Sequence, residues 1–492
     1  MNFAGLLFLI ITHYLCGRGL LQLFKLQLSN ILTTCFSIMT GVLLVSFVPC
    51  FVQLLHIPIT ATSISVAIII FTAICSIPLL INFKRPQFKK IVLPELYELP
   101  FLLVCLGLVI LSVWRCYYYP PTARDMLSGP ELLAEYTVRE KTMINSVFTI
   151  DLHTTNNYFK SPYITCLQII YKLLVQHFGQ VWMSVLYLPF ITFIYTMLRE
   201  RVHPFLASLL LFFFMAIPDL FAYSFVMLYD YSNMVFFFSG FYFLVKYLEN
   251  KEANYFAFSV LLFGFATYIR VETVVLVALM AMLPLYNFYK EKVAFKNIAL
   301  RLGLFIGIPF FFYIICMHVF VRSFVPIPYH ATNDINTKLG DISYFFSRIG
   351  AMNDILIFGQ QGKIVYGYFM MVFLFLFVAD FAFNLTNTKT RGFNRESRFA
   401  LFGITVIYLG LPFMGYLFPL FDIMNTTKRG LFKILPIMLL YMSNSSLVQK
   451  LSDQLKKWEV PKNVPQPKGR PVANIASAPK QNIKINPKKK GK

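Results

Sequence analysis

Apolar runs of about 20 residues recur along almost the whole chain, and a helix of that length crosses the hydrocarbon core of a bilayer. Inside lipid every backbone N–H and C=O group must find a partner within the protein, so only helices and closed barrels can span a membrane. The sequence lacks the short segments of alternating apolar and polar residues that a barrel requires. We therefore predict an all-α fold, a polytopic helical membrane bundle.

The composition supports this fold class. The 492 residues are 58% hydrophobic and only 13% charged, which leaves too little polar surface to cover a soluble globule of this size. We predict about thirteen transmembrane helices. They lie near residues 2–24, 31–53, 61–81, 98–114, 181–198, 205–222, 232–246, 255–270, 272–288, 302–321, 364–383, 401–420 and 431–447.

Lysine and arginine gather in five short loops that share one side if the predicted spans alternate. They are Lys84, Arg85, Lys89 and Lys90; Arg199 and Arg201; Lys246 and Lys251; Lys290, Lys292, Lys296 and Arg301; and Lys389, Arg391, Arg395 and Arg398. Because basic loops stay in the cytoplasm, we expect the N-terminus outside and the C-terminus inside. The long loops 115–180 and 322–363 are then external. The chain shows no clear eukaryotic targeting signal, which favours a bacterial inner membrane.

Three regions follow from this pattern. They are N-terminal spans with a cytoplasmic loop (1–97), a transmembrane region with both external loops (98–447), and a basic tail (448–492) that we expect to be disordered. The basic loops and the tail account for much of the net charge of +22, so we expect membrane lipids and no nucleic acid as partners. No HExxH metal motif or Walker-type phosphate loop is present.

The first external loop has the features of a catalytic loop. Asp125 follows the end of a predicted span, and Pro130 opens an amphipathic helix in which Glu135 and Arg139 are spaced to form an i,i+4 ion pair. The apolar stretch 163–174 is too short to span, so we expect it to lie along the membrane interface. External amphipathic loop helices are therefore part of the predicted fold.

Four segments, in this order and on one predicted side, resemble a known family. They are Asp125, Ser161-Pro162-Tyr163, Tyr229-Asp230-Tyr231-Ser232-Asn233, and Gly264 to Glu272. Over residues 98–443 the chain resembles GT-C class membrane glycosyltransferases of the protein O-mannosyltransferase and aminoarabinose-transferase type. The segments depart from the family pattern at Arg270, where lysine is usual, at Thr273, where glycine is common, and at Ser161, which replaces a proline.

The resemblance implies an inverting glycosyltransferase. Its donor would be a polyprenyl-phosphate-linked sugar, and its acceptor a glycan, lipid or protein at the extracytoplasmic face. Such a reaction needs a carboxylate for the acceptor and cations for the departing phosphate. The resemblance gives the carboxylate role to Asp125 and makes Asp230 a second catalytic acid. No cofactor is required, and a divalent metal is not excluded.

The resemblance also suggests the substrate-binding residues. Lys428 and Arg429 precede the last span, and a guanidinium binds two phosphate oxygens at once. Arg270 and Glu272 lie in a short external turn, and His330 lies in the second external loop. We expect all five to face the substrate.

Each of these residues also has a structural interpretation. The two aspartates can cap helices, Arg270 and Glu272 can form a buried ion pair, the Lys-Arg pair can anchor the last span at the interface, and His330 can be an ordinary loop histidine. Other functions remain open for the whole chain: a lipid or oligosaccharide transporter or flippase, a sugar-polymer polymerase or ligase, and a noncatalytic assembly subunit.

Overall fold

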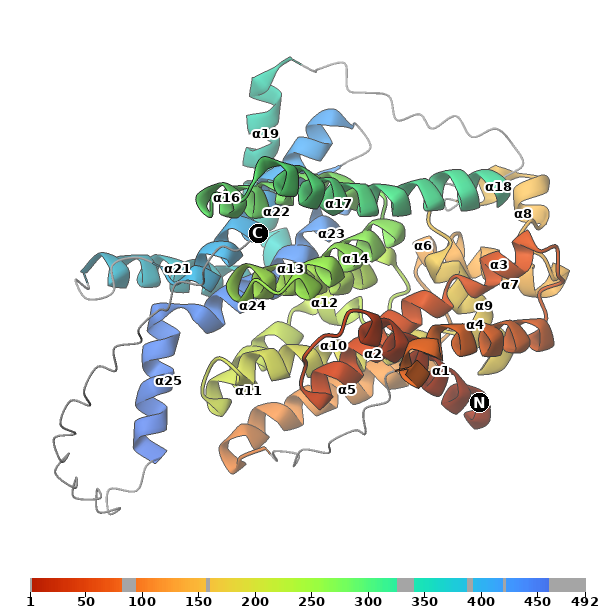
Figure 1. Ribbon diagram of the computed structural model, residues 1–492, viewed down its shortest axis with the longest axis horizontal. Coiled ribbons are helices and arrows are strands. Elements are labelled where there is room, and N and C mark those ends of the chain that lie inside the picture. The colour runs from red at the N-terminus through yellow and green to blue at the C-terminus, as the bar shows by residue number, and fades with distance from the viewer. Residues whose placement is uncertain are drawn as a thin grey trace, which may run out of the picture.

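The computed structural model describes residues 2–81, 94–155, 160–324, 340–386, 393–418 and 422–459. These residues form helices and no strand, which confirms the all-α prediction. Most of the long helices run in similar directions, with the loop helices α6–α9 at one end of the bundle and α25 across the other (Figure 1).

The first four helices form a unit held by close backbone contact. A Cβ atom added at Gly17 would overlap the carbonyl oxygen of Ser37, and one at Gly41 would overlap that of His13. Small residues allow helices in lipid to approach this closely. The helices are α1 (Phe3–Leu23), α2 (Asn30–Val45), α3 (Val48–Leu54) and α4 (Ala61–Ile81).

The described residues of the loop 119–180 form short helices, as predicted. Lys172 holds α7 on α9 through Glu131 (2.6 Å) and Glu135 (2.9 Å), and the predicted Glu135–Arg139 pair is present at 2.9 Å. The elements are η1 (Leu96–Glu98), α5 (Leu99–Tyr118), α6 (Arg124–Leu127), α7 (Pro130–Glu140), α8 (Ser146–Thr149), η2 (Leu152–Thr154) and α9 (Tyr163–Leu174). Helix α9 has the predicted bounds, and protein from α2–α4, α7 and α10 packs around it.

The middle of the chain forms the centre of the bundle. Helix α13 is buried along nearly its whole length and packs closely against α14. The elements are α10 (Val181–Arg199), α11 (Pro204–Met215), α12 (Pro218–Ala222), α13 (Tyr229–Asn250), α14 (Ala253–Ile269), α15 (Thr273–Met280), α16 (Met282–Lys290), α17 (Phe295–Ile314), the π-helical turn η3 (Ile315–Val321) and α18 (Arg322–Phe324).

The remaining elements complete the bundle around α13. They are α19 (Ile342–Met352), the π-helical turn η4 (Asn353–Ile357), α20 (Gln360–Tyr366), α21 (Phe369–Thr386), α22 (Arg395–Leu417), the π-helical turn η5 (Ile423–Thr427), α23 (Lys428–Gly430), η6 (Leu431–Lys433), α24 (Ile434–Asn444) and α25 (Ser446–Glu459). The disorder predicted from residue 448 is wrong as far as Glu459, because α25 buries Val448 and Ser452 against the bundle. The rest of the predicted tail lies outside the described residues.

Nine helices in the described part of the chain are long and apolar enough to cross a membrane, and a tenth is added if Ile423–Asn444 and Ser446–Glu459 form one bent span. These ten match ten predicted spans, so the chain is a multi-pass membrane protein. The other three predicted spans match α11, α13 and α14. Helices α11 and α14 have only 12 and 17 residues, and α13 begins with polar residues that protein surrounds instead of lipid.

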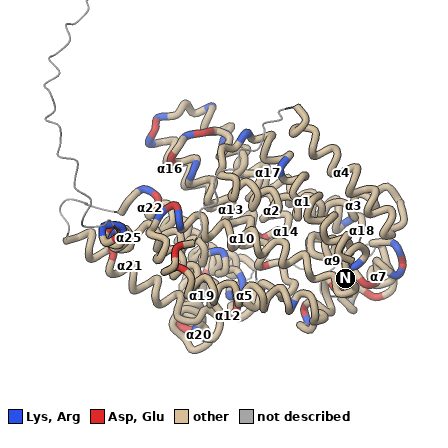
Figure 2. Tube along the Cα trace, turned by 90° about the horizontal axis from the view of Figure 1, so that it is seen from below, with Lys and Arg blue, Asp and Glu red and all other residues tan. Residues whose placement is uncertain are grey.

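Charged residues gather around α16, α22 and α25 at one end of the bundle and around α7 at the other, with a further group near α12, and the long helices are uncharged over most of their length (Figure 2). The basic end joins residues from the predicted cytoplasmic loops: Arg199 with Glu98, Arg201 with Glu396, and Lys251 and Arg395 with Glu291. The opposite end, the loop end, joins the N-terminus to the first long loop, since Asn2 N–H donates to Val175 C=O. The 22 residues of α13 separate the two ends by about 30 Å.

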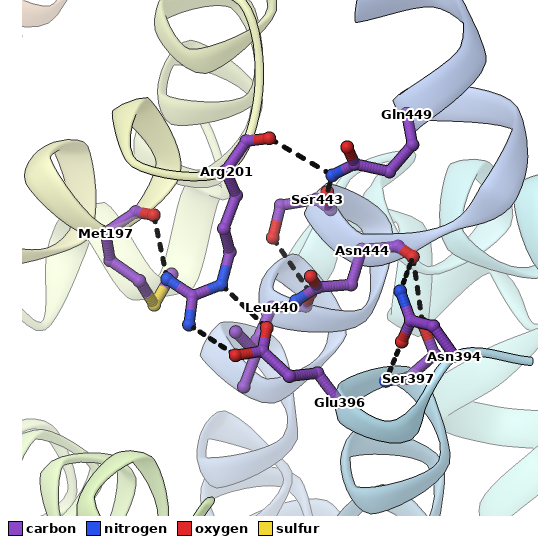
Figure 3. A network of polar contacts seen from close by, with 9 residues as sticks. All are labelled: Met197, Arg201, Asn394, Glu396, Ser397, Leu440, Ser443, Asn444 and Gln449. Atoms are coloured by element: carbon purple, nitrogen blue, oxygen red, sulfur yellow. Dashed lines mark hydrogen bonds and ion pairs between the residues drawn. The ribbon is translucent and has the colours of Figure 1, made fainter. Parts of the chain in front are cut away.

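A polar network ties four helices together at the basic end (Figure 3). Arg201 donates from Nε and Nη2 to both carboxylate oxygens of Glu396, at 2.9 and 3.0 Å. Its backbone carbonyl accepts from Gln449 of α25 at 3.1 Å, and Asn394 at the start of α22 donates to Asn444 C=O at the end of α24. The side chains of Arg201 and Glu396 are only 8% and 15% exposed, so neither charge is well solvated alone.

Replacing Arg201 with methionine should therefore destabilise the fold by roughly 3–5 kcal/mol, because Glu396 would keep a buried charge without its partner. The double variant R201M/E396M should recover much of the loss. Thermal unfolding in detergent measures both effects. Arg395, which is 44% exposed and 3.7 Å from Glu291, is the matched control: R395M should cost less than about 1 kcal/mol. Equal losses for the two single variants would contradict this interpretation.

Candidate functional site

Charged side chains from segments far apart in the sequence converge at the loop end. They come from α6, the segment before α9, the start of α13, the turn between α14 and α15, and the start of the last span. We call this group the charged cluster; it comprises Asp125, Lys160, Asp230, Arg270, Glu272, Arg429 and Lys433.

Asp125 and Arg429 form one half of the cluster. Arg429 Nη2 donates to Asp125 Oδ2 at 2.9 Å, although the two residues lie 304 positions apart. Asp125 lies in the first turn of α6, but Ala123 is the N-cap residue, so Asp125 does not cap this helix. Tyr223, which follows α12, lies close to Arg429. The carboxylate of Asp125 is 40% exposed and is accessible to a substrate.

The backbone before Arg429 explains where its side chain points. Asp422 caps the π-helical turn η5, accepting from the backbone N–H groups of Asn425 (2.8 Å) and Thr426 (2.9 Å). A π-helical turn shifts the residues that follow relative to a regular helix and is frequent at functional sites. Lys428 is directed to Asp219 of α12 (3.1 Å), whereas Arg429 is directed to Asp125.

Asp230, Arg270 and Glu272 form the other half. Arg270 follows the last residue of α14 in an extended conformation, and its guanidinium contacts both carboxylates. Asp230 is nearly inaccessible, with 4% of its side chain exposed. The structural interpretation of Arg270 and Glu272 as an ion pair is therefore correct, and Asp230 belongs to the same network.

Neutral hydrogen bonds fix this half of the cluster. Asn233, one turn after Asp230, donates from Nδ2 to Ala266 C=O (2.7 Å) and to Thr273 Oγ1 (3.0 Å). Tyr229 O–H donates to Ser161 C=O (2.9 Å). Of the segments of the family resemblance, 229–233 thus contacts both 161–163 and 264–272.

Two cations that the sequence motifs did not predict belong to the cluster. Lys160 is half-buried, with Asp125, Asp230, Arg270 and Arg429 as charged neighbours; burial first, and then Arg270, lower its pKa below the ordinary lysine value. Lys433 is buried near Arg270 and the carboxylates of the second half of the cluster. A signal for Lys433 was present in the sequence, because it lies four residues after Arg429, at one-turn helical spacing, inside an otherwise apolar span.

An apolar pocket opens beside Lys160. It is small and partly open to solvent, and it lies between the loop helices and the end of the long helix that begins with α17. Lys160 is its one charged lining residue among the described residues. The apolar lining includes Leu133, Met143, Phe148, Phe320 and Phe324.

The structure thus brings Asp125, Asp230, Arg270, Glu272 and Arg429 into one cluster, and it places Lys428 in a separate ion pair with Asp219. His330 lies outside the described residues. Within the described part of the chain, no group of three His, Cys, Asp or Glu side chains is placed to hold a metal ion. The chain matches no family model, no curated protein and no solved structure.

The contact between Arg270 and Asp230 predicts energetic coupling. In a double-mutant cycle of R270M and D230N, we expect an interaction energy of about 0.5–3 kcal/mol, the range for residues that share a network. Thermal unfolding in detergent supplies the four values. A cycle of D230N with K296M, at an exposed position of α17, should be additive. Additivity in both cycles would show that the ion pair contributes nothing specific.

Proposed function

We propose that this protein is an inverting GT-C type glycosyltransferase that moves a sugar from a polyprenyl-phosphate donor to an acceptor at the extracytoplasmic face of the membrane. The observation that supports this most is the contact between Asp125 and Arg429. It places an accessible carboxylate next to a guanidinium at one end of a membrane bundle, within reach of headgroups.

The proposed chemistry needs these two groups close together. The acceptor hydroxyl attacks the anomeric carbon, the bond from that carbon to the phosphate oxygen breaks, and the hydroxyl proton passes to Asp125. Polyprenyl phosphate leaves with one more negative charge than it carried in the donor. Arg429 and Lys160 stabilise this added charge electrostatically.

The remaining groups have supporting roles in this proposal. Asp230 and Glu272 hold Arg270 next to the phosphate site. Buried Lys433 adds positive charge near Arg270. Lys428 is paired with Asp219 and takes no direct part in this chemistry. The apolar side chains that line the pocket beside Lys160 offer a surface for the first isoprene groups of the donor.

The proposed topology follows the positions of the two ends. In this topology all thirteen predicted spans cross the membrane. The span 205–222 does so as the α11–α12 pair, which runs from His203 at the basic end to Asp219 near the charged cluster. The basic end faces the cytoplasm and the loop end faces outward, in a bacterial inner membrane. The acceptor is then a glycan, lipid or protein outside the cell.

Cysteine labelling tests this orientation. A cysteine in place of Ser347 of α19 should react with an impermeant thiol reagent added outside intact cells, whereas one in place of Lys290 at the end of α16 should react only after permeabilisation. Both positions are exposed, and the native cysteines are buried or half-buried, so background labelling should be low. Labelling of Lys290→Cys but not Ser347→Cys from outside would reverse the proposed orientation.

Lipid binding tests the phosphate site. Replacing Arg429 with alanine should weaken polyprenyl-phosphate binding by roughly 2–5 kcal/mol, the cost of truncating one partner of a desolvated charge pair. Lysine should recover only part of the loss, because an ammonium cannot make the planar two-point contact. Binding is measured on purified protein in detergent, with neutral polyprenol as the ligand control.

Lys428→Ala is the matched protein control, because this neighbouring cation contacts Asp219 instead of Asp125. It should retain most of the binding. Equal affinity of the wild type for phosphate and alcohol, or an unchanged affinity in the Arg429 variant, would contradict the phosphate site and favour the transporter or assembly-subunit alternatives.

A further inference from the structure

Arg429 has a hydrogen-bonding edge that is only partly used. Its Nη2 donates to one oxygen of Asp125 at 2.9 Å, while its Nε is buried and has no hydrogen-bond partner among the described residues. The Nε–H and one Nη2–H bond of a guanidinium point in the same direction and match the spacing of two oxygens on one anion. Asp125 therefore occupies half of a two-point oxyanion site.

A phosphate would use this edge more completely than Asp125 does. Two of its oxygens can accept from Nε and Nη2 together, and a buried N–H group without a partner is unfavourable. Asp125 and the phosphate would compete for Nη2 of Arg429 and for the space beside it. The carboxylate is partly exposed and lies on the four-residue helix α6, so it can move away without breaking a cap.

We infer that Asp125 is a built-in competitor of the donor phosphate at Arg429, so that donor binding releases the acceptor-activating carboxylate. This inference rests on the proposed function. Before the donor binds, the Asp125 carboxylate is paired with Arg429. After the phosphate takes the Nε–Nη2 edge, the carboxylate is free to accept a hydrogen bond from the acceptor hydroxyl. The donor therefore binds before the acceptor.

Competition has a measurable consequence for donor affinity. Removing the charge of Asp125 should tighten binding of polyprenyl phosphate, even though the same variant should lose turnover. Because a hydrogen bond to a charged group contributes about 1.5–3 kcal/mol, D125N should bind the lipid phosphate roughly tenfold to a hundredfold more tightly than the wild type.

Two controls separate competition from a general loss of negative charge. Asp422 lies close enough to Arg429 to interact electrostatically but forms no ion pair with it among the described residues, and asparagine can replace it as a helix cap. D422N should therefore tighten binding much less than D125N. In the R429A background, D125N should change affinity little, because the site of competition is gone.

The test measures binding of polyprenyl phosphate and of polyprenol to the full-length wild type and to D125N, D422N, R429A and D125N/R429A in detergent. Circular dichroism and gel filtration check that each variant is folded. Tighter phosphate binding by D125N that needs Arg429 supports competition. If phosphate binding needs Arg429 but D125N leaves it unchanged or weakens it, competition is overturned and the proposed function stands. The same conclusion follows if D422N tightens binding as much as D125N does, or if D125N also tightens binding in the R429A background. If neither the wild type nor D125N binds polyprenyl phosphate better than polyprenol, the proposed function itself is overturned.

Discussion

Lipid solvates neither charges nor unpaired backbone groups, and this constraint determines where each polar side chain of the bundle lies. Many of the described charges gather at the two ends, where several buried ones have partners of opposite charge, whereas buried Asp380 accepts from Tyr441 O–H and Leu447 N–H. Arg201 and Glu396 close one end with a two-point ion pair, and Arg270 links Asp230 and Glu272 near the other. The apolar helices between the ends can pack closely because these charges are already neutralised by their neighbours.

The charged cluster differs from the network at the basic end in how completely its groups are paired. Arg201 uses both sides of its guanidinium, on Glu396 and on Met197 C=O. Arg429 leaves its buried Nε without a partner among the described residues, and Asp125 remains partly exposed. An incompletely paired cation beside an accessible carboxylate is poorly explained by stability alone, and it suits a site that must bind and release an anion.

The sequence predicted the fold class and most of the span positions because hydrophobic runs of membrane length are a strong signal. It also predicted the pairing of Glu135 with Arg139, a local contact set by helix geometry. It did not predict α25, whose amphipathic face is stabilised by contacts with distant residues such as His203 and Arg201. Of the candidate site, five residues and the pairing of Arg270 with Glu272 were foreseen, but the contacts of Asp125 with Arg429 and of Asp230 with Arg270 were not. The opposite directions of Lys428 and Arg429 depend on the π-helical turn before them, which no hydrophobic pattern reveals.

The central claim is that Arg429 and its neighbours bind the phosphate of a polyprenyl donor. A structure of the full-length protein in a lipid nanodisc with polyprenyl phosphate bound tests it most directly. We predict density for the phosphate on the Nε–Nη2 edge of Arg429 and near Lys160, with the Asp125 carboxylate moved off the guanidinium and the lipid chain along the apolar side chains beside Lys160. A phosphate bound elsewhere, with the Asp125–Arg429 contact intact, would contradict the account.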